Sequence, residues 1–418
     1  METYHYPKSQ ALFERASKVI PAGIYGHLGP SEGCYIPVSA YPFYASRAEG
    51  PYIWDLDGNC FTDYMCAYGP IVLGYNHPEV DAAARAQMEL GNCTVLPSER
   101  MVELAELLVD TVDSADWAFF AKNGGDVTNL GILTARAATG RKKIVKFKGG
   151  YHGVAQWMQD LGYAGIIAED VANVITIPFN DAAAFERVIA ENPDQIAGLI
   201  STPYHHPAMA DNALPEEGFW KRIRELCTRH GIVLIIDDVR CGFRLDTRGS
   251  DHHYGFKADL ICFCKALGNG YNISALCGNA ALKSAASAVF YTGSYWLSSV
   301  PMAAAIKTVT ILRQINGAKI MTESGKKLTE GLVKAATEHG FHLKVSGEPA
   351  MWFMRLTDDE GGFLHQEWIA ECVRRGAFFT SHHNLFMNTA MDDGVIKHTL
   401  DIAEDAFKTV LKNHPERK

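Results

Sequence analysis

The sequence lacks the features that place a protein in a membrane or on nucleic acid. No stretch of roughly eighteen or more apolar residues occurs, so we expect no transmembrane helix. The formal net charge of −9 argues against nucleic acid and anionic membranes as partners, because both call for basic patches. The first residues lack a basic segment followed by an apolar one, so no signal peptide is expected.

Cysteine usage excludes a disulfide framework. The ten cysteines are scattered, and the closest pair, Cys262 and Cys264, has a C-x-C spacing that zinc sites do not usually show. We therefore expect reduced thiols, no metal site and a cytoplasmic location. The 418 residues contain no repeat, low-complexity run or Ser/Gly linker, and their 47% hydrophobic content is enough for two domains with a large core.

Strands and helices alternate along the middle of the chain. Strands are expected at 117–121, 144–147, 174–177, 197–201, 232–236 and 260–263, and helices at 99–112, 127–139, 181–190 and 217–230. Such alternation predicts an α/β fold with a mostly parallel sheet and helices on both faces. We expect this large domain at residues 61–300, with a smaller α+β domain built from residues 1–60 and 301–418.

Two of the expected strands end in residues that carry chemistry. Residues 231–236 lead into Asp237 and Asp238, and residues 259–264 lead into Lys265. The carboxyl ends of parallel strands meet at one edge of a sheet, where ligands bind. A lysine amine can form a Schiff base with an aldehyde cofactor, and a carboxylate can keep a pyridine nitrogen protonated. By itself this pattern fits a structural Lys–Asp salt bridge equally well, and Asp238 fits a structural carboxylate better.

Two further segments follow expected strands. Asn123, Gly124 and Gly125 precede a helix, where backbone amides can bind a phosphate, although such turns are also common without a ligand. Tyr151 can stack on a planar ring, and His152 can support the ring or the nearby acid. A core aromatic residue and a structural histidine explain Tyr151 and His152 as well.

Taken together, these segments resemble the class III aminotransferases, which are fold type I enzymes that use pyridoxal phosphate. The resemblance spans nearly the whole chain and is strongest at residues 151–153, 237–244 and 265–270. Residues 63–70, 138–141 and 146–147 look like the branch that contains glutamate-1-semialdehyde aminomutase. Residues 237–244 combined with 293–305 look most like the fumonisin-detoxifying aminotransferases, which move an amine from an aliphatic aminopolyol to pyruvate.

The resemblance implies how the cofactor is held. Lys265 matches the Schiff-base lysine, Asp237 the acid at the pyridine nitrogen, and Tyr151 and Val239 the residues on opposite faces of the ring. His152 lies beside this stacking position in the sequence.

The resemblance also implies two phosphate contacts. Residues 123–125 replace the Ser-Gly-Thr phosphate turn of the family, and because two of the three residues differ, backbone amides should dominate there. Ser294 stands where the family has a threonine that reaches the phosphate of the neighbouring subunit. The resemblance therefore predicts a homodimer with shared active sites.

The predicted reaction moves an amino group from a primary aliphatic or ω-amine donor to a keto acid such as pyruvate. The segment after Pro21-Ala22-Gly23 lacks the arginine that holds the substrate carboxylate in the aminomutase, which argues against the alternative of intramolecular transfer. A silent cofactor-binding protein, a racemase and a decarboxylase are further alternatives. Candidate substrate residues are Tyr25, Tyr68, Tyr295 and Trp296, each equally consistent with core packing, and Arg240 or His382 and His383 for the acceptor carboxylate.

Overall fold

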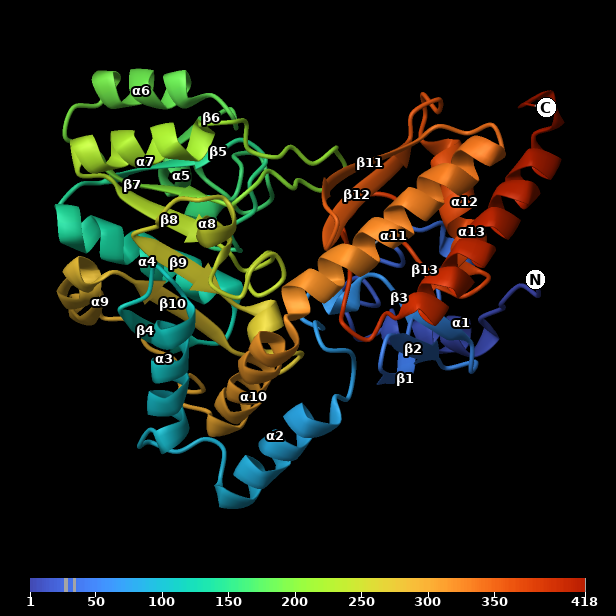
Figure 1. The fold of residues 1–418 in the computed structure, drawn as a ribbon, viewed down its shortest axis with the longest axis horizontal. Helices are drawn as coiled ribbons and strands as arrows, with labels where there is room; N and C mark the ends of the chain where they lie inside the picture. The colour runs from blue at the N-terminus through green and yellow to red at the C-terminus, as the bar shows by residue number, and fades with distance from the viewer. Residues whose placement is uncertain (26–28, 33–34, 418) are drawn as a thin grey trace. The chain divides into compact units, whose positions relative to one another are not determined.

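The computed structural model describes residues 1–25, 29–32 and 35–417 (Figure 1). The chain divides into two compact units. The terminal unit comprises Met1–His77, His206–Asn212 and Lys319–Lys418, and the central unit comprises Pro78–His205 and Ala213–Ala318. Within the described residues, no helix combines the length and the apolar character needed to cross a bilayer.

The domain boundaries expected at residues 60 and 300 remain a prediction, whereas the two compact units divide after His77 and Ala318. At the first division, strand β3 (Cys60–Asp63) pairs with strands of the terminal unit. At the second, helix α10 (Ser299–Ile315) packs on α2 (Pro78–Leu90) and α3 (Glu99–Thr111), which keeps it in the central unit.

A seven-stranded sheet in the order β4-β10-β9-β8-β7-β5-β6 forms the core of the central unit (Figure 1). Its strands are β4 (Trp117–Ala121), β5 (Lys143–Phe147), β6 (Val174–Ile177), β7 (Ile196–Ser201), β8 (Val233–Asp237), β9 (Leu260–Phe263) and β10 (Ser274–Gly278). Strand β10 runs antiparallel to both of its neighbours, while β5 to β9 pair in parallel. The mostly parallel sheet predicted from the alternation is therefore confirmed.

The central strands of this sheet are almost entirely apolar, as expected where layers cover both faces. All residues of β7 and β8 are buried. Helix α4 (Gly124–Thr139) packs across β7 to β10, and a Cβ on its Gly131 would lie 3.3 Å from Ile235 Cγ2. The remaining helices of the unit are α5 (Ala168–Val171), α6 (Ala182–Glu191), α7 (Phe219–His230), α8 (Ser250–His253) and α9 (Lys283–Ala288).

The terminal unit contains two smaller sheets. One has the order β1-β2-β3-β13 and the other β11-β12-β14. Their remaining strands are β1 (Ala45–Glu49), β2 (Tyr52–Asp55), β11 (Leu343–Glu348), β12 (Met351–Leu356), β13 (Ala377–Phe378) and β14 (Leu385–Phe386), and the helices are α1 (Pro7–Ala16), α11 (Gly317–Glu338), α12 (Phe363–Val373) and α13 (Asp393–Asn413). Strand β13 pairs in parallel with β3, so this sheet joins segments from both ends of the chain.

Candidate functional site

Two neighbouring strands of the central sheet deliver an acid and an amine to the same edge. Asp237 is the last residue of β8, and Lys265 follows the end of β9 by two residues. The two strands pair in parallel, with Asp237 opposite Cys262. Both side chains therefore lie at the carboxyl edge of the sheet, where open α/β sheets bind ligands.

A buried histidine holds the acid. His152 Nδ1 lies 2.7 Å from Asp237 Oδ2, and both side chains are almost completely buried. The amide of Val239 donates to Asp237 Oδ1 at 3.2 Å, so both carboxylate oxygens have partners. Thr128 Oγ1 in α4 donates to the carbonyl oxygen of His152 at 2.6 Å, which fixes the loop after β5.

The neighbouring Asp238 is a structural residue. It accepts hydrogen bonds from the Ser250 amide at 2.9 Å and from the Ser250 hydroxyl at 2.6 Å. Burial raises its pKa to about 7. Its two bonds to α8 anchor the segment that follows Asp237.

The environment of Lys265 favours a neutral amine. Burial, followed by the positive charge of Arg240, lowers the pKa of Lys265 to about 7 from its ordinary value of 10.5. Its backbone has φ 44°, in the left-handed region that residues with a Cβ rarely occupy. Such strain concentrates at functional sites. A neutral amine is the nucleophilic form of lysine.

Arg240 belongs to the same cluster of charges. Burial lowers the pKa of its guanidinium, while interactions with Cys241, Tyr204 and Asp237 oppose that shift. Together with its effect on Lys265, this places a cation in the electrostatic neighbourhood of both the acid and the amine.

Glycines let the turn before α4 pack closely against the segments after β8 and β5. A Cβ on Gly124 would lie 2.8 Å from Val239 Cγ1, and one on Gly153 would lie 2.7 Å from Gly125 Cα. Asp126 Oδ2 accepts the amide of Asn123 at 2.8 Å, which holds the start of the helix. The exposed amides at a helix N-terminus attract anions.

Asn129, a polar residue of α4, links two loops near this turn. Asn129 Oδ1 accepts the indole N–H of Trp157 at 2.8 Å, and its Nδ2 donates to the Tyr291 hydroxyl at 3.1 Å. The Trp296 ring packs half-buried on Tyr291, with centroids 5.1 Å apart, and edge-on to Phe119. Trp296, one of the substrate candidates in the central unit, thus packs against neighbouring aromatic rings.

Three other candidates of the central unit are exposed. Tyr151 is 62% exposed and Tyr295 is 69% exposed. Ser294 is also exposed, and its carbonyl oxygen accepts the thiol of Cys93 at 3.4 Å.

The remaining candidates belong to the terminal unit. Tyr68 lies edge-on to His383, with ring centroids 5.5 Å apart, and His382 contacts the ring of Tyr35 at 4.8 Å. Tyr25 is 64% exposed. The segment read as lacking the aminomutase arginine includes residues 26–28, which lie outside the described residues.

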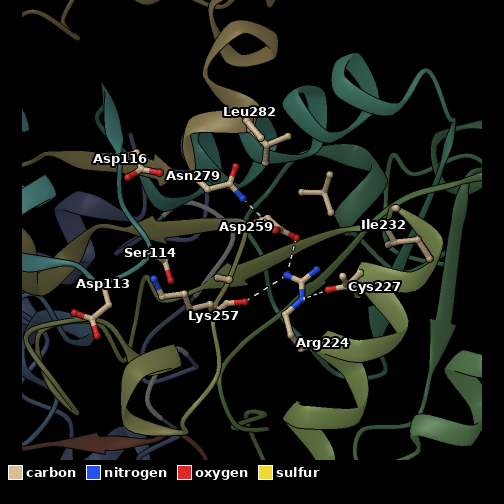
Figure 2. Close-up of a pocket in the computed structure, with 15 residues that line it drawn as sticks. Asp113, Ser114, Asp116, Arg224, Cys227, Ile232, Lys257, Asp259, Asn279 and Leu282 are labelled. Carbon is tan, nitrogen blue, oxygen red and sulfur yellow. Dashed lines mark hydrogen bonds and ion pairs between the residues drawn. The ribbon is translucent and has the colours of Figure 1, made fainter.

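A cavity of about 510 Å³ lies at the opposite edge of the central sheet (Figure 2). Its walls include Val233 and Asp259 at the amino ends of β8 and β9. Arg224 closes one side through a 2.7 Å ion pair with Asp259. The cavity is therefore not part of the edge that carries Asp237 and Lys265.

Comparison with known proteins identifies the family. The model of the class-III aminotransferases matches residues 35–411. The chain belongs to the class III aminotransferase family. The aminopentol aminotransferase of Sphingopyxis macrogoltabida is 40% identical over 97% of this aminotransferase and 95% of the relative. The glutamate-1-semialdehyde 2,1-aminomutase of Methanocaldococcus jannaschii is 31% identical over 96% of this chain and 98% of its own.

A solved structure confirms the fold type I architecture. The pyridoxal phosphate internal aldimine form of the Sphingopyxis sp. MTA144 FumI protein superposes with a TM-score of 0.94. It is 40% identical and covers 97% of each chain. Class III aminotransferases use pyridoxal phosphate, and the predicted enzyme class and cofactor are thereby confirmed.

Some features of the site were missed by sequence reasoning. Thr128 and Asn129 lie in the middle of an ordinary helical pattern, so only their spacing from the glycine turn could have suggested that they hold loops. The left-handed backbone of Lys265 had no sequence signal, because no glycine or asparagine marks that position.

Proposed function

We propose that this aminotransferase takes an amino group from a primary aliphatic or ω-amine and delivers it to a keto acid such as pyruvate, with Lys265 and Asp237 as the reacting pair. The observation that carries the proposal is a half-buried amine, with a pKa lowered to about 7, just after the strand next to the one that ends in a buried carboxylate. A structural salt bridge would favour a charged lysine, whereas the surroundings of Lys265 favour the neutral form.

The residues at the sheet edge fit pyridoxal phosphate. Lys265 would hold the cofactor covalently, and Asp237 would face its pyridine nitrogen. Gly124 lets the start of α4 pack against Val239, and the phosphate would lie beside the first amides of α4. When bound, the cofactor supplies an aldehyde that condenses with amines and a ring that accepts the electron pair left by a departing proton.

The chain itself binds, orients and moves protons. The Lys265 amine would act as the base and acid that moves a proton from the substrate carbon bearing the nitrogen to the cofactor carbon that takes up that nitrogen. His152 and the Val239 amide keep Asp237 in one orientation, so its negative charge stays available to a protonated nitrogen. Tyr151 and Val239 would enclose the ring from opposite faces, and His152 would support this arrangement through Asp237.

The donor we propose is a long-chain amine or an aminopolyol. The 40% identity with an aminopentol aminotransferase supports this class. Tyr25, Tyr68, Tyr295 and Trp296 are proposed as an aromatic wall for the donor. Arg240 is proposed to meet the acceptor carboxylate, because a guanidinium pairs with a carboxylate through two parallel hydrogen bonds.

We further propose a homodimer in which Ser294 reaches the phosphate of the second copy. Residues 92–98 and 294–300 lie side by side, since the Ser299 amide donates to the Asn92 carbonyl oxygen at 2.7 Å. Apolar side chains on and beside these loops are exposed, among them Val95 at 91% and Phe290 at 95%. A second copy would cover such a surface. Light scattering after size exclusion tests the dimer, and a monomer at micromolar concentration would contradict it.

The location we propose is the cytoplasm. Every cysteine of the described residues is a free thiol, which suits a reducing compartment.

A half-reaction screen tests the proposed activity. Single amines are added to the cofactor-loaded protein without any keto acid, and the visible absorbance of the bound cofactor is followed. We expect long-chain or ω-amines to bleach this absorbance and pyruvate to restore it. Bleaching only by glutamate-1-semialdehyde would favour the aminomutase reaction, and the absence of any bleaching would contradict amine transfer.

A further inference from the structure

One side chain of α4 is bonded to two segments that lie far apart in the sequence. Asn129 Oδ1 accepts the indole N–H of Trp157, 28 residues away, at 2.8 Å. Its Nδ2 donates to the hydroxyl of Tyr291, 162 residues away, at 3.1 Å. A side-chain amide is planar and can accept and donate at the same time. Asn129 therefore joins the two segments within the central unit through a single rigid group.

The first of these segments follows β5. It carries Tyr151 and His152, which are proposed to lie at the cofactor ring and at its acid. Thr128, the residue before Asn129, donates to the His152 carbonyl oxygen at 2.6 Å. Trp157 is bonded to Asn129 farther along the same segment. Two adjacent residues of α4 thus hold this segment at two points.

The second segment connects α9 to α10 and contains Tyr291. Burial raises the pKa of the Tyr291 hydroxyl, the hydrogen bond from Asn129 opposes this shift, and the charge of Asp126 adds to it. Asp126 Oδ2 accepts the Asn123 amide at 2.8 Å, at the start of α4. The Trp296 ring packs on Tyr291, with centroids 5.1 Å apart. Tyr291 therefore lies in the electrostatic neighbourhood of the helix start where the phosphate is proposed to bind.

We propose that Asn129 is a positioning residue for the cofactor, because it holds the segment beside the ring and the segment beside the phosphate in one arrangement. This inference rests on the proposed function, which places the ring at Tyr151 and the phosphate at the first amides of α4. Asn129 lies roughly 7.5 Å along the helix axis from Gly124, at 1.5 Å per residue. It acts through the segments that it bonds and not through contact with the reacting atoms.

The amide of Asn129 keeps its orientation only while both of its bonds exist. Loss of either partner leaves a polar atom of a half-buried amide unpaired and frees the amide to turn, which weakens the other bond. The two segments then move independently, and the cofactor must order both of them when it binds. We therefore expect the contribution of Asn129 in the affinity for the cofactor and not in the rate of the loaded enzyme.

The decisive variant is Asn129→Leu, which removes both bonds and keeps a branched side chain. Asn192→Leu is the matched control, because Asn192 is also half-buried and its amide also makes two bonds. Its Oδ1 accepts Lys143 Nζ at 2.5 Å at the amino end of β5, and its Nδ2 donates to the Val188 carbonyl oxygen at 2.8 Å. Both variants should lower Tm, since each loses two hydrogen bonds.

The cofactor affinity separates positioning from a merely structural role. Fluorescence titration of the cofactor-free proteins gives the Kd of pyridoxal phosphate. We expect N129L to raise this Kd about tenfold and N192L to leave it unchanged. At saturating cofactor, kcat of N129L should stay within about twofold of the wild type. A Kd of N129L equal to that of the wild type, or an equal loss of affinity in N192L, would overturn the proposal.

Two further variants test whether Asn129 links the segments. Trp157→Phe and Tyr291→Phe each remove one of its bonds. If the amide needs both bonds, each variant alone should raise the cofactor Kd about five- to tenfold, and the double variant should raise it no more than about tenfold. Effects that multiply in the double variant would show that the two segments are held independently, which contradicts the link.

The position of the cofactor and the role of Asn129 fail in different ways. If the cofactor does not bind at this edge of the sheet, Lys265→Ala and Asp237→Asn take it up with the affinity of the wild type. If only the role of Asn129 is wrong, those two variants lose affinity for the cofactor and N129L does not.

Discussion

His152 and Asp237 form a buried pair, with Nδ1 and Oδ2 2.7 Å apart, although 85 residues separate them in the sequence. The loop after β5 and the end of β8 are joined at this contact. Because Asp237 Oδ1 also accepts the Val239 amide, the carboxylate is held in one orientation. The acid therefore depends on a residue from another strand for its geometry, and the two should behave as a unit.

Removing the charge of Asp237 tests this unit. We expect Asp237→Asn to lower kcat at least about 100-fold, because the pyridine nitrogen loses its partner. His152→Asn keeps a hydrogen-bond donor, so its loss in kcat should be about tenfold smaller than that of Asp237→Asn. The double variant should resemble Asp237→Asn alone, with a coupling energy of about 1–3 kcal/mol in cofactor affinity. Strictly additive losses would show that the two residues act independently.

Lys265 should be indispensable for turnover. We expect Lys265→Ala to lower kcat at least about 10³-fold, since both the covalent attachment and the proton transfer are lost. Lys257→Ala is the matched control, because Lys257 lines the cavity at the amino edge of the same sheet (Figure 2). Steady-state rates and the spectrum of the bound cofactor measure both variants. Turnover by K265A at the wild-type rate would contradict the proposed mechanism.

The pH dependence of cofactor capture reports on Arg240. Burial and the Arg240 charge lower the pKa of Lys265 to about 7, so capture by the cofactor-free protein should rise with pH through about 7 and then level off. Arg240→Gln removes a cation and should shift this midpoint upward, whereas Arg240→Lys should leave it nearly unchanged. Stopped-flow absorbance gives the midpoints.

The lowered pKa of Lys265 also determines how the stability of the folded protein changes with pH. Because folding lowers the pKa of Lys265 from 10.5, its stabilising contribution is fully present above that value and is lost as pH falls through about 7.

In the capture experiment, an R240Q midpoint pH at or below that of the wild type would show that Arg240 does not act on Lys265.

Cofactor binding should require the close contact between Gly153 and Gly125 beside the turn that precedes α4. Gly153 has φ 113°, and a Cβ there would lie 2.7 Å from Gly125 Cα. Gly162 has nearly the same φ of 112° but nothing within 4 Å, so Gly162→Ala carries the same backbone strain without the clash. We expect Gly153→Ala to weaken cofactor binding at least about tenfold and Gly162→Ala to leave it unchanged. Fluorescence titration of the cofactor-free variants measures this, and equal affinities would refute the role of the close approach.

The sequence was sufficient to predict the sheet and the acid–amine pair. Apolar runs ending in Asp237 and Lys265 identify strands whose ends carry chemistry, and these correspond to the parallel neighbours β8 and β9. Strand β10 was not predicted, because Ser274–Gly278 contains no β-branched residue and its antiparallel pairing depends on β4, far away in sequence. Long-range pairing of this kind leaves little local signal.

Backbone strain was beyond sequence reasoning for a related reason. Left-handed residues are usually marked by glycine or asparagine, but Lys265 and Ala67 are neither. Their conformation is imposed by surrounding contacts, such as the bonds of Asp63, which exist only in the folded chain. Packing likewise decided the position of Trp296, whose contact with Phe119 comes from a strand far earlier in the chain.

The pairing of β3 with β13 has a consequence for synthesis on the ribosome. All residues of the central unit have been made once Ala318 is added, but Thr62 must wait for its partner Ala377. At about 5–20 residues per second, several seconds pass between these two points. The strand that carries Thr62 therefore stays without its β13 partner throughout this interval, while the central unit can already fold.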